Sequence, residues 1–422
     1  GMVGAALSSL GLYYMVQAFP AKWRLKALVL GLGASQLALP LARLFSEDLL
    51  QIAEWRGLYL FELGLALTSL GCVFMLKLPP GDRFRTFEKL DFLTFALLAT
   101  GVALLCAVLS LGRIDWWLEA PWIGYASAAS ILLIMAGLCI EHNRSNPMLM
   151  TRWLGSGAII RLALAVILIR MVLSEQSTGA VGFLQALNMS SQQMRMLYGV
   201  MLLGSIAGLA TSALTINPAH LLMPLVISLA LMAVGSVMDS FSSNLTRPAN
   251  MYFSQFLLAF GGTFFLGPTM VLGTRNVLTN PRNLVSFSVL FGICQNLGGL
   301  IGSALLGTFQ IVREKYHSSH IVEQLTLLDP QVLARVQSGG AAYGKVIADP
   351  DLRTLQGIRS LATAATREAN VLAYNDVFML IAVIAVLTMI WIFIRSLWLM
   401  STTQAIAPAA PAPVQQSGAS SS

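Results

Sequence analysis

The chain carries very little charge for its length. Of its 422 residues, 11% are Asp, Glu, Lys or Arg, whereas a soluble domain carries about 25%. Hydrophobic residues make up 56% of the chain, and the mean hydropathy is +0.73. So few charged side chains cannot cover the surface of a soluble protein of this size. The composition therefore excludes an ordinary soluble domain.

The chain also lacks the residue patterns of common enzymes and metal proteins. Its four cysteines all lie inside apolar runs, so we expect buried thiols without disulfide or metal partners. No CxxC, HExxH, Walker or GxSxG motif occurs, and the four histidines are scattered. The net charge of +7 is not gathered into a Lys/Arg cluster interleaved with aromatic residues. We expect no cofactor, no metal ion and no nucleic-acid partner.

What the chain has instead is a succession of long apolar runs separated by short polar loops. Each run has about 20 residues, which is enough for a helix to cross the ~30 Å hydrocarbon core of a bilayer. There are about eleven such runs, at approximately 2–19, 27–45, 57–77, 91–111, 120–140, 159–184, 196–216, 220–239, 250–273, 285–311 and 375–397. The sequence therefore predicts an all-α polytopic membrane protein.

Basic residues are distributed unevenly between alternate loops, which predicts the orientation in the membrane. The richer set of loops, predicted to be cytoplasmic, holds Lys22, Arg24, Lys26, Lys77, Arg83, Arg85, Lys89, Arg144, Arg152, Arg275 and Arg282. The long segment Arg313–Tyr374 is then extracytoplasmic, and Gly1 also starts outside, without a signal peptide to bring it there. We therefore expect about three further helices to precede Gly1 in the natural product.

Several short motifs follow one another along the chain in a characteristic order. A glycine-rich stretch runs from Gln295 to Leu305 and is followed by the segments 313–320 and 373–378. The earlier members of the series are Trp55-Arg56, Leu90-Asp91, Asn146-Pro147 and Gln185. Taken in order over residues 1–400, the series resembles the EmrB/QacA-type exporters, the fourteen-helix drug:proton antiporter branch of the major facilitator superfamily.

The resemblance implies a major facilitator fold and a secondary active transporter, with proton-coupled efflux of small organic or drug-like compounds across the bacterial inner membrane. It divides the chain into the remainder of an N-terminal bundle (1–79), two inserted linker helices (80–150), a C-terminal six-helix bundle (151–400) with the extracytoplasmic loop 313–374, and a disordered tail (401–422). The helices expected before Gly1 would include a cytoplasmic gating motif, so the chain as given is expected to be transport-incompetent. The implied partners are the organic substrate, protons and the lipid bilayer.

One stretch departs from the pattern of the family. The antiporter motif on the family's fifth helix has Gly-Pro followed by paired glycines. The aligned stretch Leu39–Phe45 keeps Pro40 but has Ala42-Arg43 in place of Gly-Pro. This difference leaves the direction of transport open. In the next span, Glu62 stands where the family usually has Asn.

Polar residues inside the apolar spans are the candidates for a substrate and proton pathway, because a charge in hydrocarbon is costly unless it is paired or hydrated. Arg170, Glu175 and Gln176 are expected near the middle of their span, and the first two are too far apart in rotation to face each other. Their alternative role is structural ion pairing with a neighbouring helix.

Further candidates lie on three other spans. Glu62 is expected to be a buried carboxylate able to carry a proton, or alternatively an interfacial residue in contact with water. Aromatic and amide side chains that would wall a substrate site, or simply pack, are Tyr13, Tyr14, Gln17 and Gln255.

Small residues mark the expected packing and gating positions. Gly298 and Gly302 form a face that lets two helices approach closely, as packing alone or as part of a rocking motion. Gly267-Pro268 predicts a kink, because proline has no N–H for the helical hydrogen bond.

The outer segment carries two helix-start signals. Asp329-Pro330 and Asp349-Pro350 each place a capping acid before a proline. We expect two amphipathic helices separated by Gly339-Gly340, the second running toward the last span. They would cap the transporter or dock a periplasmic adaptor protein. At the fourth span, Asp91 is predicted to be the N-cap.

Two functions of other classes stay open at this point. A polytopic membrane enzyme, such as a lipid-modifying transferase, would need His, Asp and Glu clustered near one interface, and no such cluster is apparent. A non-transporting membrane scaffold would need no polar site at all.

Overall fold

The computed structural model describes residues 19–20, 23–75, 88–217, 220–275 and 282–406. Within these ranges all regular structure is helical. Ten helical segments there are long and apolar enough to cross a membrane. The chain is therefore an all-helical, multi-pass membrane protein. The predicted span at 2–19, with Tyr13, Tyr14 and Gln17, lies outside the described residues except for Phe19, and part of the tail lies outside them too.

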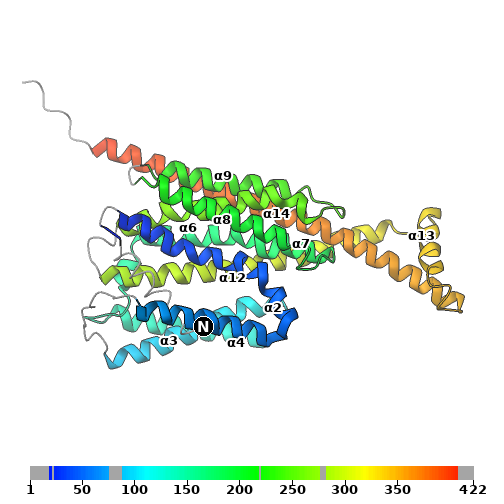
Figure 1. Cartoon of the computed structure of the whole chain (residues 1–422), viewed down its shortest axis with the longest axis horizontal. Coiled ribbons are helices and arrows are strands. Elements are labelled where there is room, and N and C mark those ends of the chain that lie inside the picture. Colours follow the sequence, from blue (N-terminus) through cyan, green and yellow to red (C-terminus); the bar gives the residue numbers. More distant parts are fainter. Residues whose placement is uncertain (1–18, 21–22, 76–87, 218–219, 276–281, 407–422) are drawn as a thin grey trace, which may run out of the picture.

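The helices lie side by side along one direction, and a helical hairpin projects from one end (Figure 1). In chain order they are α2 (Arg24–Met75), α3 (Lys89–Leu111), α4 (Pro121–His142), α5 (Thr151–Leu154), α6 (Gly157–Ser174), the π-helix η2 (Glu175–Ala180), α7 (Val181–Ala186), α8 (Arg195–Thr215), α9 (Leu222–Asp239), the 3-10 helix η3 (Pro248–Met251), α10 (Tyr252–Phe264), α11 (Leu266–Arg275), α12 (Arg282–Gln324), α13 (Pro330–Ala341) and α14 (Pro350–Ile406).

The six spans from α6 to α14 form one bundle. Neighbouring pairs run α8–α10, α10–α9, α9–α14, α14–α12 and α12–α6, and α6 also contacts α14. Fully buried apolar side chains fill the centre, among them Phe183, Phe378, Leu229 and Met232. Burial of these side chains between helices fixes the bundle that positions the site.

The helix α2 differs from the prediction, because it continues where we expected a loop between two spans. No Gly or Pro occurs between Ser46 and Arg56, and the Glu, Leu, Gln and Ala residues of this stretch favour helix. Figure 1 shows the helix bending back on itself there. The first half packs on α8, whereas the second half, Trp55–Met75, has no buried residue. Glu62, for which we expected either a buried or an interfacial position, is exposed on this half.

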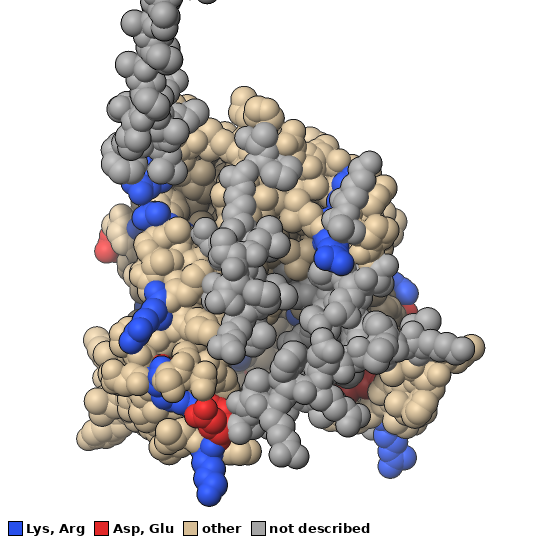
Figure 2. Space-filling model, turned by 90° about the vertical axis from the view of Figure 1, so that its left-hand side faces the viewer, with Lys and Arg blue, Asp and Glu red and all other residues tan. Residues whose placement is uncertain are grey.

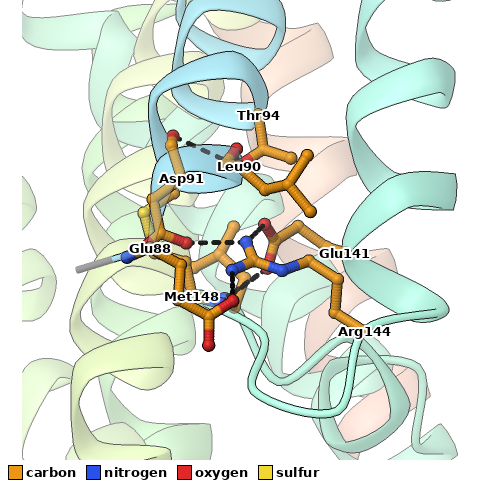
Figure 3. A network of polar contacts seen from close by, with 8 residues as sticks. Glu88, Leu90, Asp91, Thr94, Glu141, Arg144 and Met148 are labelled. Atoms are coloured by element: carbon orange, nitrogen blue, oxygen red, sulfur yellow. Dashed lines mark hydrogen bonds and ion pairs between the residues drawn. The ribbon is translucent and has the colours of Figure 1, made fainter. Parts of the chain in front are cut away.

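The helices α3 and α4 form a hairpin whose end is held by one ionic network (Figure 3). Arg144 Nη2 lies 2.8 Å from Glu88 Oε2, and Arg144 Nη1 lies 2.6 Å from Asp91 Oδ1 and 2.9 Å from Glu141 Oε1. The hydrogen bonds to Glu88 and then Asp91 raise the pKa of the Arg144 guanidinium above its usual value. The N-cap of α3 is Glu88, not Asp91 as predicted; Asp91 is the third helical residue and accepts the Glu88 N–H at 2.8 Å.

The kink predicted at Gly267-Pro268 is present as an interruption between α10 and α11. Pro268 has no N–H for the carbonyl of Phe264, and that carbonyl accepts the Ser212 hydroxyl of α8 at 3.1 Å. The same Ser212 oxygen accepts the Gly267 N–H at 3.1 Å. A Cβ on residue 267 would collide with this oxygen, so the glycine lets one serine satisfy both sides of the break.

The two helices predicted in the outer segment are present, with one correction. Asp329 caps α13 by accepting the Gln331 N–H at 2.8 Å, and α14 runs from Pro350 through the last span as one helix. The pair Gly339-Gly340 does not separate the helices but lies inside α13, because the backbone of α14 approaches closely there. A Cβ on Gly340 would lie 2.6 Å from the carbonyl oxygen of Arg353.

One end of the bundle carries more basic than acidic side chains (Figure 2). Lys and Arg side chains recur across the end opposite the α13–α14 hairpin, with fewer Asp and Glu (Figure 2). The orientation with this end in the cytoplasm and the hairpin outside stays a prediction.

Candidate functional site

A cavity of about 1080 Å³ lies between the first half of α2 and the helices α6, α8, α10 and α12, with two side chains of α3 at its margin. Its polar lining residues include Gln36, Ser174, Gln176, Ser177, Thr263, Gln295, Asn296 and Ser303. Its apolar lining residues include Leu39, Leu173, Val181, Met201, Phe291 and Leu300. A cavity of this size and mixed lining is large enough for a small organic molecule.

Arg170 projects into this cavity from α6. It stands 13 residues after Gly157, about 20 Å along the helix, which is deep in the bundle. Its Nη1 donates to Gln36 Oε1 of α2 at 3.1 Å. Its Nε is buried and has no hydrogen-bond partner among the described residues. Within the described chain, Arg170 also forms no ion pair with a carboxylate. Its positive charge is therefore held by neutral groups alone.

Arg43 lines the same cavity from α2. Its Nη1 donates to the Tyr198 hydroxyl of α8 at 3.4 Å, and its guanidinium lies 5.7 Å from the centre of the Tyr198 ring. Gln36 and Arg43 are seven residues apart, so they share one face of α2 about 10 Å apart along its axis. Among the described lining residues, Arg43 and Arg170 are the charged ones.

A second polar group lies beside the cavity and consists of two buried carboxyl groups bridged by one amide. Gln255 Nε2 lies 3.0 Å from each carboxylate oxygen of Glu175 and 2.8 Å from Asp239 Oδ2. Ser254 donates its hydroxyl to Asp239 Oδ1 at 2.5 Å. Both carboxyl groups are buried, and neither lines the cavity.

Asp239 and Gln255 lie toward the end of the bundle from which the α13–α14 hairpin projects, and Glu175 reaches them from within the 30-residue span Gly157–Ala186. Asp239 is the last residue of α9 and Gln255 is in the first turn of α10. Arg170, in contrast, does lie deep in the bundle.

The π-helix η2 connects the carboxyl pair to the cavity. It begins at Glu175, and its next residue, Gln176, lines the cavity. Gln176 Nε2 donates to the backbone carbonyl of Gln255 at 3.3 Å. π-Helical turns inside α-helices often occur at functional sites. Here the turn places adjacent residues of one helix in two different polar environments.

Of the predicted pathway residues, Arg170 and Gln176 line the cavity, whereas Glu175 and Gln255 belong to the buried polar group beside it. The structure places Gly298 and Gly302 of α12 against α6, where a Cβ on Gly298 would lie 2.8 Å from Arg170 Cβ and one on Gly302 would lie 2.9 Å from Met171 Cα. Glu62 does not line the cavity. Gly267 and Pro268 do not line it either, and they lie in the first turn of α11, just after the break between α10 and α11.

Two residues of the site were missed in the sequence. Asp239 is the last residue of the predicted span 220–239 and was not among the candidates, although a carboxylate at the end of an apolar run was a usable signal. Arg43 was noticed only as a departure from a glycine-containing motif. Its position one helical repeat from Gln36 was the signal that both face one side of α2.

Comparison with known protein families gives no match for this chain, and comparison with curated proteins gives none either.

Proposed function

We propose that this chain acts in secondary active transport and moves a small organic compound across a membrane in exchange for protons. The observation that carries the proposal is the 1080 Å³ cavity between membrane-spanning helices, with a buried carboxyl pair next to it. A scaffold protein has no need of buried charged groups around a cavity, because each is costly in a membrane interior.

The carboxyl pair suits proton exchange. Two carboxylates around one amide in a medium of low dielectric constant repel each other, and a proton held on one of them relieves that repulsion. Gain or loss of this proton changes the hydrogen bonds that Gln255 makes. Gln176, which lines the cavity, is bonded to the backbone carbonyl of Gln255, and a movement of Gln255 would reach the cavity through this bond.

The wider framework of the proposal is the major facilitator superfamily, in its fourteen-helix drug:proton antiporter branch. In that framework the six-helix bundle rocks against a second bundle, and the first half of α2 belongs to this second bundle. The cavity between the two bundles then opens to one side of the membrane and to the other in turn. The sequence motifs support this assignment, and so does the position of the cavity between α2 and the six-helix bundle. The membrane would be the bacterial cytoplasmic membrane and the direction efflux.

The proposal predicts that Glu175→Gln in the native protein abolishes transport driven by a proton gradient. The amide is neutral at all pH values, so it cannot release a proton, yet it preserves the size of the side chain. Counterflow exchange of substrate, which needs no net proton movement, is expected to continue.

Everted vesicles with an imposed pH gradient and a panel of labelled naphthalene derivatives of different charge measure both activities. Glu323→Gln is the matched control, because Glu323 is exposed on the outer part of α12. If the wild-type protein moves none of the compounds in either assay, the transport proposal is wrong. If Glu175→Gln retains gradient-driven transport, the carboxyl pair is not the coupling site.

A further inference from the structure

We infer that the cavity binds an organic anion through the unoccupied edge of the Arg170 guanidinium, with Arg43 as a second cationic contact. The inference names the substrate class of the proposed transporter and rests on that proposal for its biological meaning. The two charged residues among the described lining of the cavity are both arginines, and neither has a carboxylate partner in the part of the chain that the structure describes.

An arginine in this position needs a counter-charge or water. Ionisable residues inside membrane-spanning segments normally pair with one another or face hydrated cavities. The nearest candidate in sequence, Glu175, does not serve, because its carboxylate is bonded to Gln255 on the far side of η2. The positive charge of Arg170 is therefore available to a ligand.

The geometry of Arg170 identifies the edge that a ligand would use. Gln36 occupies Nη1, whereas Nε is buried with no partner in the described part of the chain. The Nε and Nη2 hydrogens point in parallel and match the two oxygens of a carboxylate. A neutral or cationic compound makes no comparable pair of bonds there.

Gly299 lies directly beside this edge. A Cβ on residue 299 would lie 3.4 Å from Arg170 Nε and 4.0 Å from Nη2, in ordinary van der Waals contact with the guanidinium. A methyl group there would cover the edge without displacing the helices. The glycine one position earlier differs, because a Cβ on Gly298 would lie 2.8 Å from Arg170 Cβ and 3.1 Å from the backbone of Ile167.

The rest of the cavity suits an amphiphile. Leu39, Leu173, Phe291 and Met201 offer apolar surface, and the serines and amides of α6 and α12 offer hydrogen bonds. The ligand class that fits both parts is a carboxylate on an apolar, aromatic body.

Three probes of nearly equal shape test the inference: naphthalene-2-carboxylate, 2-naphthamide and 2-naphthylmethylammonium. Their binding to the 422-residue chain in lipid nanodiscs is measured by titration calorimetry. We expect the carboxylate to bind at least ~10-fold more tightly than the amide, since a charge-assisted bidentate pair is about twice as strong as neutral hydrogen bonds. The ammonium compound is expected to bind most weakly.

Variants test which residues cause the preference for the carboxylate over the amide. Arg170→Ala is expected to remove the difference between carboxylate and amide, and Arg170→Lys to restore part of it, because lysine keeps the charge but not the fork. Gly299→Ala is expected to weaken the carboxylate and leave the amide unchanged. Arg195→Ala is the matched control, because Arg195 pairs with Asp48 at an exposed position away from the cavity.

The inference is overturned if the amide binds as tightly as the carboxylate, if none of the probes binds, or if Arg170→Ala keeps the preference. The binding results and the transport results test the two proposals independently. Vesicles that move all three naphthalenes equally leave transport standing without anion selectivity, whereas tight carboxylate binding without movement leaves the anion site standing without transport.

Discussion

Two arginines of this molecule, Arg144 and Arg170, are both largely withdrawn from solvent but have opposite surroundings. Arg144 lies against three carboxylates at 2.6 to 2.9 Å and has 7% of its side chain exposed. Arg170 has one hydrogen bond, to the neutral amide of Gln36, and a buried Nε without a partner in the described structure. Arg144 is surrounded by more negative charge than it carries, whereas Arg170 has no negatively charged partner in the described structure.

The difference indicates two roles. A cation surrounded by its own carboxylates has no capacity left for a ligand, and the Arg144 network ties α3 to the end of α4 and to the chain that follows it (Figure 3). A cation held by neutral groups beside a cavity is costly in the empty protein and gains most when an anion arrives. Arg144 is therefore expected to stabilise the fold, and Arg170 to bind.

The largest expected effect comes from giving Arg170 the partner that Arg144 already has. Gln36→Glu places a carboxylate where the amide oxygen now lies, 3.1 Å from Nη1. The new ion pair should abolish the preference for naphthalene-2-carboxylate over 2-naphthamide, a loss of at least ~10-fold or about 1.4 kcal/mol. Calorimetric titration measures it, with Gln36→Met as the uncharged control. Unchanged carboxylate binding in Gln36→Glu would mean that the ligand does not use Arg170.

An effect on stability, not on binding, is expected from Gly298→Ala, which tests the packing behind Arg170 without changing any charge. The added methyl group overlaps the Arg170 Cβ and the Ile167 backbone, and overpacking of this kind lowers the free energy of unfolding by about 1–3 kcal/mol. Thermal unfolding in nanodiscs compares it with Gly299→Ala, for which we expect little change in stability. Equal stability of the two variants would contradict the close contact between α6 and α12.

The smallest effect is expected from Glu62→Gln. From the sequence we expected Glu62 to carry protons, but its side chain is exposed on the half of α2 that has no buried residue, whereas Glu175 and Asp239 are buried together. The pH dependence of transport in vesicles should therefore match that of the wild type. A shifted pH profile would show that Glu62 joins the proton pathway after all.

Much of this architecture follows from local sequence. Apolar runs of about 20 residues locate the membrane helices because a helix must have that length to cross the bilayer. Asp329-Pro330 and Asp349-Pro350 predict two helix starts because an acid and a proline suit the first turn. Gly267-Pro268 predicts the break between α10 and α11, although not that Ser212 of α8 would satisfy it.

The rest depends on contacts between distant segments. Asp239 joins Glu175 only because α9, α10 and η2 meet at one end of the bundle, and nothing local to Asp239 shows this. The same holds for Asp91, which looked like an N-cap and instead contacts an arginine 53 residues later. The loop expected near Ser46–Arg56 is helical because no Gly or Pro interrupts a run of good helix formers.

The contrast between the two arginines is tested most directly by thermal unfolding of Arg144→Met and Arg170→Met in nanodiscs, each with and without naphthalene-2-carboxylate. We expect Arg144→Met to unfold at a lower temperature than the wild type but to keep the stabilisation by the ligand, because three carboxylates lose their partner while the cavity is intact. Arg170→Met is expected to unfold at the wild-type temperature or above and to lose that stabilisation. The opposite pattern, with Arg170→Met destabilised and still stabilised by the carboxylate, would contradict the account.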